Sequence, residues 1–196
     1  RYRKYFRQAI EINYPGLSKD LLVQIEQEFN NLKEDVSFAN TSQSLVDRRL
    51  IFTSYFLAFI IALNRQGESF EKIRKISLQI VSEYVRPKNG IHKFMKRVPV
   101  LLLKSGIGNV LVKAFAGRAS KVGHPDGFAA KIITDKNETY GLGYGVDILE
   151  CGICKLFNKH DYSQYAKILC EVDEITSGLA GLELIRKGTI ANGAKK

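Results

Sequence analysis

The sequence contains only three cysteines and a single methionine. The cysteines, at positions 151, 154 and 170, are odd in number, which argues against a closed framework of disulfides. Reduced thiols in a cytoplasmic protein are the simplest account of them. Because Met95 is the only methionine, we expect that Arg1 is not the native first residue and that the chain is trimmed. No signal peptide is visible, although a trimmed N-terminus would hide one.

The sequence also lacks the signatures of nucleic-acid-binding and metal-binding proteins. It contains no RNA-binding signature, no zinc finger and no recognisable DNA-binding helix pair. It has no His-x-x-x-His pattern and no carboxylate cluster of the kind that holds zinc or iron. The three cysteines would need a fourth ligand or a water to complete a tetrahedral zinc site. We therefore predict no nucleic-acid partner and no cofactor, and leave a metal ion open.

No apolar stretch is long enough to cross a membrane. Residues 51–63 are the most apolar part of the chain, but a spanning helix needs about 20 apolar residues, and the same pattern begins with Asp47-Arg48-Arg49. The pattern over 45–63 favours the buried central helix of a soluble bundle over a helix that dips into a membrane. We predict no integral membrane segment. An exposed apolar remnant on this helix would indicate a homodimer.

The sequence contains an excess of positively charged residues. The formal net charge is +10, from 30 lysines and arginines against 20 aspartates and glutamates. Such a balance favours anionic partners, which include nucleic acid, an anionic membrane face and a small carboxylate. Because the basic residues are scattered along the chain, an interaction with nucleic acid or a membrane surface is the weakest of these hypotheses.

The spacing of apolar residues predicts a single α+β domain over residues 1–196. Helical spacing covers 17–32, with Ser18 as the N-cap, and continues in 45–63, 68–85 and 91–119. A hairpin of strands at 128–134 and 139–149 follows, then helices at 152–159 and 162–177 and a strand at 183–191. Asp161 is the expected N-cap of the second of these helices. The helical half (1–120) is thus predicted to pack on a small antiparallel sheet formed by the C-terminal half (121–196).

The cysteines and one aspartate are the first candidates for chemistry. Cys151 and Cys154 form a Cys-x-x-Cys pair at the junction between a predicted strand and a predicted helix. The helix dipole there would lower the pKa of the Cys151 thiol and so activate it. Cys154 is expected to point inward as a core thiol. Cys170 and Asp173 are three positions apart and share a helix face, so Asp173 is a candidate general base or a partner for a cationic substrate. The alternative is a core cysteine beside a surface aspartate.

The strand before this pair has an unusual face. Side chains alternate along a strand, so 140–148 presents Tyr144 on one face and three glycines followed by Asp147 on the other. A bare glycine face permits the close approach of a packed helix or, alternatively, of a flat ligand. His124, in the turn before the hairpin, is a candidate proton carrier at neutral pH.

Three segments resemble the L-2-amino-thiazoline-4-carboxylic acid hydrolase family, which is bacterial. They are Tyr144-Gly145-Val146-Asp147-Ile148-Leu149-Glu150-Cys151-Gly152-Ile153, Leu169-Cys170-Glu171-Val172-Asp173 and Leu182-Glu183-Leu184-Ile185-Arg186-Lys187-Gly188-Thr189-Ile190-Ala191-Asn192-Gly193. Their order and spacing match, and the match covers about residues 124–193. The family usually continues into Cys-Asp-Phe, where this sequence has Ala194-Lys195-Lys196.

The resemblance implies a hydrolase that opens a small cyclic amidine thioether toward N-carbamoyl-cysteine. It implies catalytic roles for Cys151, Cys170 and Asp173, with a thiol as nucleophile or a base or metal that activates water. The substrate would be a small carboxylate with a cationic amidine. Candidate binding residues are Asp147, Tyr144, Arg186 and His124, with Arg186 for the carboxylate and Asp147 or Asp173 for the amidine. The alternative is a noncatalytic protein of the same fold whose helices and sheet enclose a small apolar or anionic ligand, which predicts a closed apolar cavity in which the thiols do not converge with Asp173.

Overall fold

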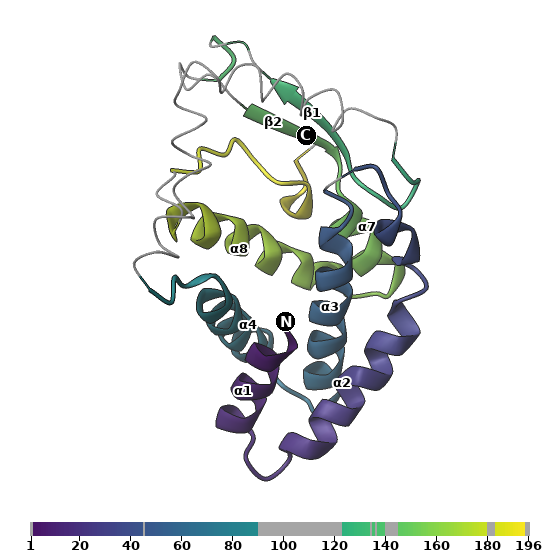
Figure 1. Ribbon diagram of the computed structural model, residues 1–196, viewed down its shortest axis with the longest axis vertical. Helices are drawn as coiled ribbons and strands as arrows, with labels where there is room; N and C mark the ends of the chain where they lie inside the picture. The colour runs from purple at the N-terminus through teal and green to yellow at the C-terminus, as the bar shows by residue number, and fades with distance from the viewer. Residues whose placement is uncertain are drawn as a thin grey trace.

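The computed structural model describes residues 2–44, 46–89, 123–133, 135, 137–139, 145–179 and 183–194. Within them, helices dominate the N-terminal half, and two antiparallel strands lie in the C-terminal half (Figure 1), so the predicted α+β class is confirmed. The predicted helix over 91–119 and Tyr144 lie outside the described residues. No helix in the described part of the chain is long and apolar enough to cross a membrane.

Four α-helices lie in the described part of the N-terminal half, residues 2–44 and 46–89. They are α1 (Arg3–Asn13), α2 (Ser18–Leu32), α3 (Arg49–Arg65) and α4 (Phe70–Val85), and the short 3-10 helix η1 (Ser37–Asn40) precedes α3. The structure confirms the helices predicted at 17–32, 45–63 and 68–85, within a few residues at each end. Ser18 is the first residue of α2 rather than its N-cap, which is Leu17, because the Ser18 hydroxyl faces back to the Pro15 carbonyl oxygen at 3.4 Å.

Helix α3 is the buried centre of the molecule, as its apolar run predicts. Every residue from Thr53 to Leu63 is buried. The ring of Phe6, on α1, packs edge-on against those of Tyr55 and Phe59 at centroid distances of 5.1 and 5.4 Å. Such aromatic pairs add roughly 0.5–1.5 kcal/mol each beyond the area they bury. The apolar side chains of α3 are buried or half-buried, so they provide no sign of a homodimer, which stays a prediction.

The C-terminal half carries the hairpin and two more helices. Strands β1 (Ala129–Ile133) and β2 (Gly145–Glu150) pair antiparallel, with Lys131 opposite Asp147. Helix α7 (Gly152–Lys159), the 3-10 helix η2 (Ser163–Tyr165) and helix α8 (Ala166–Leu179) follow. Asp161 is not an N-cap: its φ is 64°, in the left-handed region, and Tyr162 precedes η2.

The predicted strand at 183–191 is wrong. In the described part of this segment, the chain is irregular until the 3-10 helix η3 (Ile190–Asn192), which ends at Gly193 with a φ of 85°. This segment runs between the hairpin and α8 in Figure 1. It therefore forms a wall over α8 instead of a third strand.

Candidate functional site

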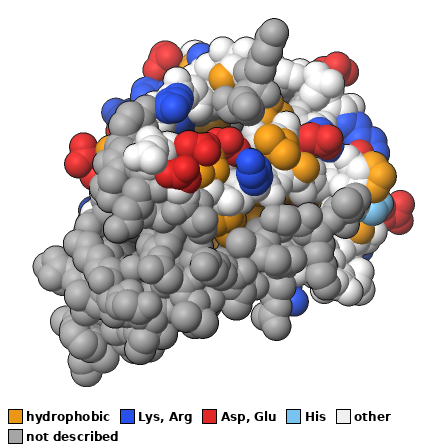
Figure 2. All heavy atoms as spheres, turned by 90° about the horizontal axis from the view of Figure 1, so that it is seen from above, with side chains coloured by type: hydrophobic (Ala, Val, Ile, Leu, Met, Phe, Trp, Pro, Cys, Tyr) orange, Lys and Arg blue, Asp and Glu red, His pale blue; other side chains and the backbone are white. Residues whose placement is uncertain are grey.

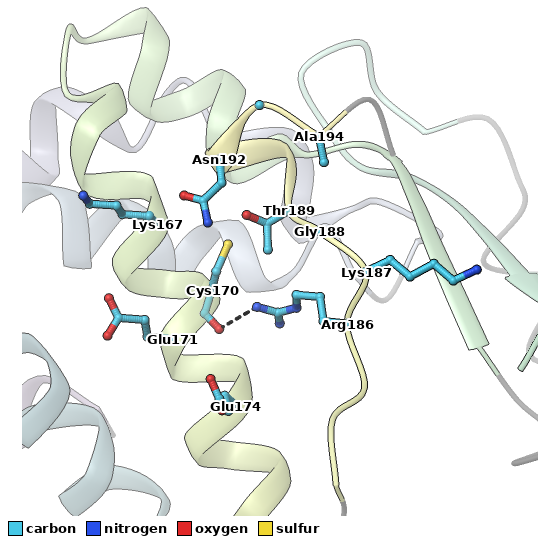
Figure 3. Close-up of a pocket in the computed structure, with 11 residues that line it drawn as sticks. Lys167, Cys170, Glu171, Glu174, Arg186, Lys187, Gly188, Thr189, Asn192 and Ala194 are labelled. Atoms are coloured by element: carbon cyan, nitrogen blue, oxygen red, sulfur yellow. Dashed lines mark hydrogen bonds between the residues drawn. The ribbon is translucent and has the colours of Figure 1, made fainter. Parts of the chain in front are cut away.

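A cleft of about 630 Å³ lies between α8 and the C-terminal segment. Helix α8 contributes one wall and residues 186–194 contribute the other (Figure 3). The side chains and backbone that line it belong to Lys167, Cys170, Glu171, Glu174, Arg186, Lys187, Gly188, Thr189, Asn192, Gly193 and Ala194. The lining therefore includes a cysteine, three cationic residues and two glutamates, although the Lys187 side chain points away from α8 in Figure 3.

Arg186 fastens the C-terminal wall to α8. Its Nη1 donates a hydrogen bond to the carbonyl oxygen of Cys170 at 3.1 Å, drawn as the dashed line in Figure 3. Its Nη2 lies 3.7 Å from Oδ2 of Asp173. One guanidinium thus contacts both the backbone and a carboxylate of the helix that carries the cleft thiol, which fixes its charge beside that thiol.

Asp173 is held between two arginines. Its Oδ1 accepts a hydrogen bond from Nη2 of Arg49, the first residue of α3, at 2.5 Å, while Arg186 approaches its other oxygen. Asp173 and Arg186 have side chains that are 34% and 29% exposed, so water screens this cluster only in part. The carboxylate joins α3, α8 and the C-terminal segment.

The Cys170 thiol is half-buried and stays protonated more readily than a free thiol. Burial raises its pKa, and the hydroxyl of Thr189 and the positive charge of Arg186 offset part of this rise. Figure 3 shows the sulfur directed toward Thr189 and Asn192. The Thr189 hydroxyl oxygen is itself buried, with no regular hydrogen bond in the described structure. It is therefore placed to donate to a Cys170 thiolate.

The pKa of the Cys151 thiol is lowered, in contrast to that of Cys170. It is the N-cap of α7, the position that the sequence predicts for the activated thiol. The Cys154 thiol, aided by the backbone N–H groups of Cys154 and Ile153, lowers the pKa of Cys151 to about 7 against the effect of burial. These amides form no capping hydrogen bond of regular geometry with the sulfur, so their influence is that of the helix N-terminus. Cys154 packs against the hydrophobic core, and its pKa is raised because Cys151 and burial both favour its protonated form.

The two thiols and Asp173 lie within electrostatic reach of one another. A charge on Cys151 raises the pKa of Cys170, and the charge of Asp173 raises the pKa of both cysteines. Of these three, only Cys170 lines the cleft in the described part of the chain. Cys151 is not part of the lining and lies at the start of α7.

Two other sequence-predicted binding residues, Asp147 and His124, lie elsewhere in the described structure, and the prediction for Tyr144 falls outside the described residues. Asp147 is on β2, outside the cleft lining. The ring of His124 stacks on that of Phe38 with centroids 3.9 Å apart, and its Nδ1 accepts the backbone N–H of Asp126 at 3.2 Å. Arg186 is thus the one member of the predicted binding set that the described cleft contains.

Sequence reasoning missed six polar residues of the cleft: Lys167, Glu171, Glu174, Lys187, Thr189 and Asn192. Helical spacing would have found Lys167 and Glu174, which are three residues before and four after Cys170 and so share its face. Glu171 also lines the cleft, and it accepts hydrogen bonds from the guanidinium of Arg74 on α4 at 2.5 to 3.0 Å. Asn192 lies on η3, which only the fold brings over α8.

Sequence reasoning also missed the structural role of Asp47, a buried carboxylate that holds the turn around Gly127 in place. It is fully buried, and it accepts hydrogen bonds from the Ser42 hydroxyl at 2.5 Å and from the Phe128 amide at 2.9 Å. The chain around Gly127 passes so close that a Cβ there would lie 2.6 Å from its Oδ1. Asp47 thereby positions the turn that packs on the start of α7, where a Cβ at Gly152 would lie 3.1 Å from the Asp126 carbonyl oxygen.

On the face shown in Figure 2, the described charged side chains form no single basic patch, and the described residues include no metal-binding group. Figure 2 shows one face of the molecule, on which the described cationic and anionic side chains are interspersed and not gathered into one basic patch. Within the described ranges, no three His, Cys, Asp or Glu side chains are grouped in a way that could hold a metal ion. The described cleft therefore offers a thiol and ion-pairing groups.

Comparison with known proteins gives one match. The family model described as L-2-amino-thiazoline-4-carboxylic acid hydrolase matches residues 48–196. This range contains α3, the hairpin, α7, α8 and the whole cleft lining. No curated protein and no solved structure matched the chain.

Proposed function

This chain belongs to the L-2-amino-thiazoline-4-carboxylic acid hydrolase family, and we propose that it hydrolyses a small cyclic amidine carboxylate of the 2-amino-thiazoline-4-carboxylate type. The observation that carries this proposal is that the Cys170 thiol and the Arg186 guanidinium belong to one cleft. A guanidinium is suited to a planar carboxylate, which it can bind through two parallel hydrogen bonds. The thiol supplies a nucleophile at a short distance from that anchor.

The bond that breaks is the ring C–S bond. In the product, N-carbamoyl-cysteine, the former ring carbon keeps both nitrogens and gains an oxygen from water. The ring sulfur therefore leaves as a thiol, and the net reaction consumes one water. Hydrolysis of a C–N bond would leave a different product, so product analysis separates the two.

In the proposed mechanism, Cys170 is the nucleophile. Its thiolate adds to the electrophilic ring carbon, the C–S bond of the ring opens, and the released sulfur takes a proton. Water then adds to the same carbon, and the Cys170 sulfur leaves, which regenerates the enzyme. The Thr189 hydroxyl and the Arg186 charge offset part of the rise in the pKa of Cys170 that burial causes, and so they support the thiolate in this step.

Asp173 serves in this scheme as a positioning residue. Its carboxylate already forms ion pairs with two guanidinium groups. A third cation, the substrate amidine, would therefore be only weakly stabilised by it. Glu174, which lines the cleft on the next turn of α8, is the better partner for the amidine. Cys151 supplies a negative charge near Cys170 and serves as the alternative nucleophile.

The cleft favours this hydrolase over a noncatalytic protein of the same fold that binds an apolar ligand. A protein that only binds an apolar ligand would need a closed apolar cavity, whereas charged and polar side chains make up most of this lining. We also propose that the protein works in the bacterial cytoplasm, where the three thiols would stay reduced.

The test follows N-carbamoyl-cysteine formation from 2-amino-thiazoline-4-carboxylate by chromatography and mass spectrometry. We expect turnover by the unchanged protein, loss of about a hundredfold or more in Cys170→Ser, and a raised KM in Arg186→Met. Arg86→Met is the matched control, because Arg86 pairs with Glu83 on the exposed surface of α4. A parallel reaction with a chelator tests for a metal ion. Absence of product from the folded protein, or full activity in Cys170→Ser, would refute the respective assignment.

A further inference from the structure

Cys151 and Cys154 form a dithiol that the proposed mechanism does not need as a pair. Both are free thiols at the start of α7, and both are partly exposed. Neither lines the cleft described above. Two cysteines in contact outside the cleft suggest a second chemistry in this part of the molecule.

Their spacing allows a disulfide. Side chains three positions apart on a helix have Cβ atoms about 5–6 Å apart, whereas a disulfide needs about 3.5–4.5 Å. Cys151 is the N-cap and has extended backbone angles, φ −106° and ψ 107°, so the helix does not hold its side chain in place. A small rotation at this residue closes the gap without a break in the helical hydrogen bonds.

The two thiols differ in the way that a reactive dithiol requires. Cys151, with a pKa of about 7, is roughly half thiolate at neutral pH. The neighbouring Cys151 and burial both favour the protonated form of Cys154, so its pKa is raised. One cysteine is thus poised to attack an oxidant, and its neighbour is poised to displace the product.

We propose that Cys151 and Cys154 are a peroxide-sensitive dithiol that closes into one intramolecular disulfide. The Cys151 thiolate attacks hydrogen peroxide, takes one oxygen to become a sulfenic acid, and releases hydroxide. The Cys154 sulfur then attacks the Cys151 sulfur, and its thiol proton leaves with the departing oxygen as water. Overall, two thiols and one peroxide give one disulfide and two waters, and a dithiol reductant reverses the change.

Cys170 is the thiol that this reaction should spare. It lies on a different helix, its pKa is raised by burial, and the Thr189 hydroxyl adjoins it. Its protonated form is a poor nucleophile toward peroxide. The proposal therefore distinguishes a bridge within α7 from a bridge between α7 and α8.

Trypsin separates these outcomes, because Cys151 and Cys154 fall in peptide 137–155 and Cys170 falls in peptide 168–186. The native protein is treated with one equivalent of hydrogen peroxide at pH 7, alkylated and digested. We expect peptide 137–155 to lose about 2 Da, to resist alkylation, and to recover with a reductant. Cys170→Ser should behave in the same way, whereas Cys154→Ser should give a sulfenic acid at Cys151 that a 1,3-dione traps.

Mass is the readout, so the outcome does not depend on hydrolysis of a thiazoline. A cross-link between peptides 137–155 and 168–186, or alkylation of all three cysteines after peroxide, would overturn the proposal. Closure of the bridge at the same rate in protein unfolded by urea would also overturn it. The preference for a disulfide between Cys151 and Cys154 would then not depend on the N-terminus of α7. Circular dichroism before treatment verifies that each variant is folded.

Discussion

Arg49 and Asp173 are 124 positions apart in the chain, yet Nη2 of the arginine lies 2.5 Å from Oδ1 of the aspartate. This pair joins the start of the buried helix α3 to the helix that carries the cleft thiol. Because Asp173 also lies 3.7 Å from Arg186, a change in α3 reaches the C-terminal wall through one carboxylate.

The first prediction is that Asp173→Asn raises KM more than it lowers kcat. The amide retains the size of the carboxylate but loses its charge, so Arg186 is less firmly held beside Cys170. We expect KM for 2-amino-thiazoline-4-carboxylate to rise about tenfold, with kcat within about threefold of the original value. Asp20→Asn, at an exposed position in the first turn of α2, is the control. A collapse of kcat with an unchanged KM would instead indicate a general base.

The second prediction concerns the pH at which each thiol reacts. Thiolates are the reactive forms, so a lowered pKa moves reaction to lower pH and a raised pKa moves it to higher pH. Cys151 should be alkylated by iodoacetamide with a midpoint near pH 7, and Cys170 with a midpoint at higher pH than an ordinary thiol. Mass spectrometry of peptides 137–155 and 168–186 measures the rates separately.

The same difference identifies the nucleophile during turnover. If Cys170 attacks the ring carbon, kcat should continue to rise at pH values above the pKa of an ordinary thiol, because burial raises the pKa of Cys170. A rise that ends near pH 7 would point to Cys151. This pH–rate profile needs only the unchanged protein, so no substitution complicates it.

The third prediction concerns Asp35, which anchors the end of α7. Burial opposes ionisation of Asp35, but hydrogen bonds from Lys159 and His160, each at 2.7 Å, lower its pKa overall. A lowered folded-state pKa means that the stabilisation is present above the unfolded pKa of about 3.9 and is lost as pH falls through the folded value. Asp35→Asn should reduce the free energy of unfolding by about 1 kcal/mol at pH 6.

That deficit should shrink as the pH is lowered below 4, because the original protein then loses the same interaction. Urea unfolding of both proteins at pH 6 and pH 3 measures it. A deficit of equal size at both pH values would show that charge at Asp35 is not the cause.

The fourth prediction is that Gly127→Ala is strongly destabilising. The added Cβ would lie 2.6 Å from Oδ1 of the fully buried Asp47. Asp47 cannot move away without losing its bonds to Ser42 and Phe128, so the cost should be about 1–3 kcal/mol. Gly16→Ala is the matched control, because its Cβ would meet nothing within 4 Å. Equal melting temperatures for the two variants would contradict this account of the turn.

The sequence predicted the helical elements well, because burial imposes a visible spacing on a helix. The run from Thr53 to Leu63 favoured a buried helix over one that dips into a membrane, and it is a buried helix. Capping was harder to predict, because a serine or aspartate can satisfy the backbone in several local conformations. Ser18 faces a preceding carbonyl, and Asp161 adopts a left-handed conformation. The expected strand at 183–191 failed because alternation alone does not supply a neighbouring strand.

The site was predictable only where its residues are close in sequence. Cys170 and Asp173 share a helix face, and their spacing shows it. Arg49 could not be found in that way, because its contact with Asp173 depends on how α3 packs near α8. His124 looked suitable by residue type, but it stacks on Phe38 instead. Residue type indicated the chemistry, whereas long-range packing decided which groups meet.

The C-terminal wall of the cleft has a thermodynamic consequence. Residues 183–188 are exposed and form no helix or strand, and the described contacts that hold this part to α8 centre on Arg186. Such a segment opens at low cost, independently of global unfolding. A ligand that bridges Arg186 and α8 would have to suppress this opening, so part of its binding energy would appear as slower amide hydrogen exchange along the wall. Affinity at this site is thus coupled to the local folding equilibrium of the segment that encloses it.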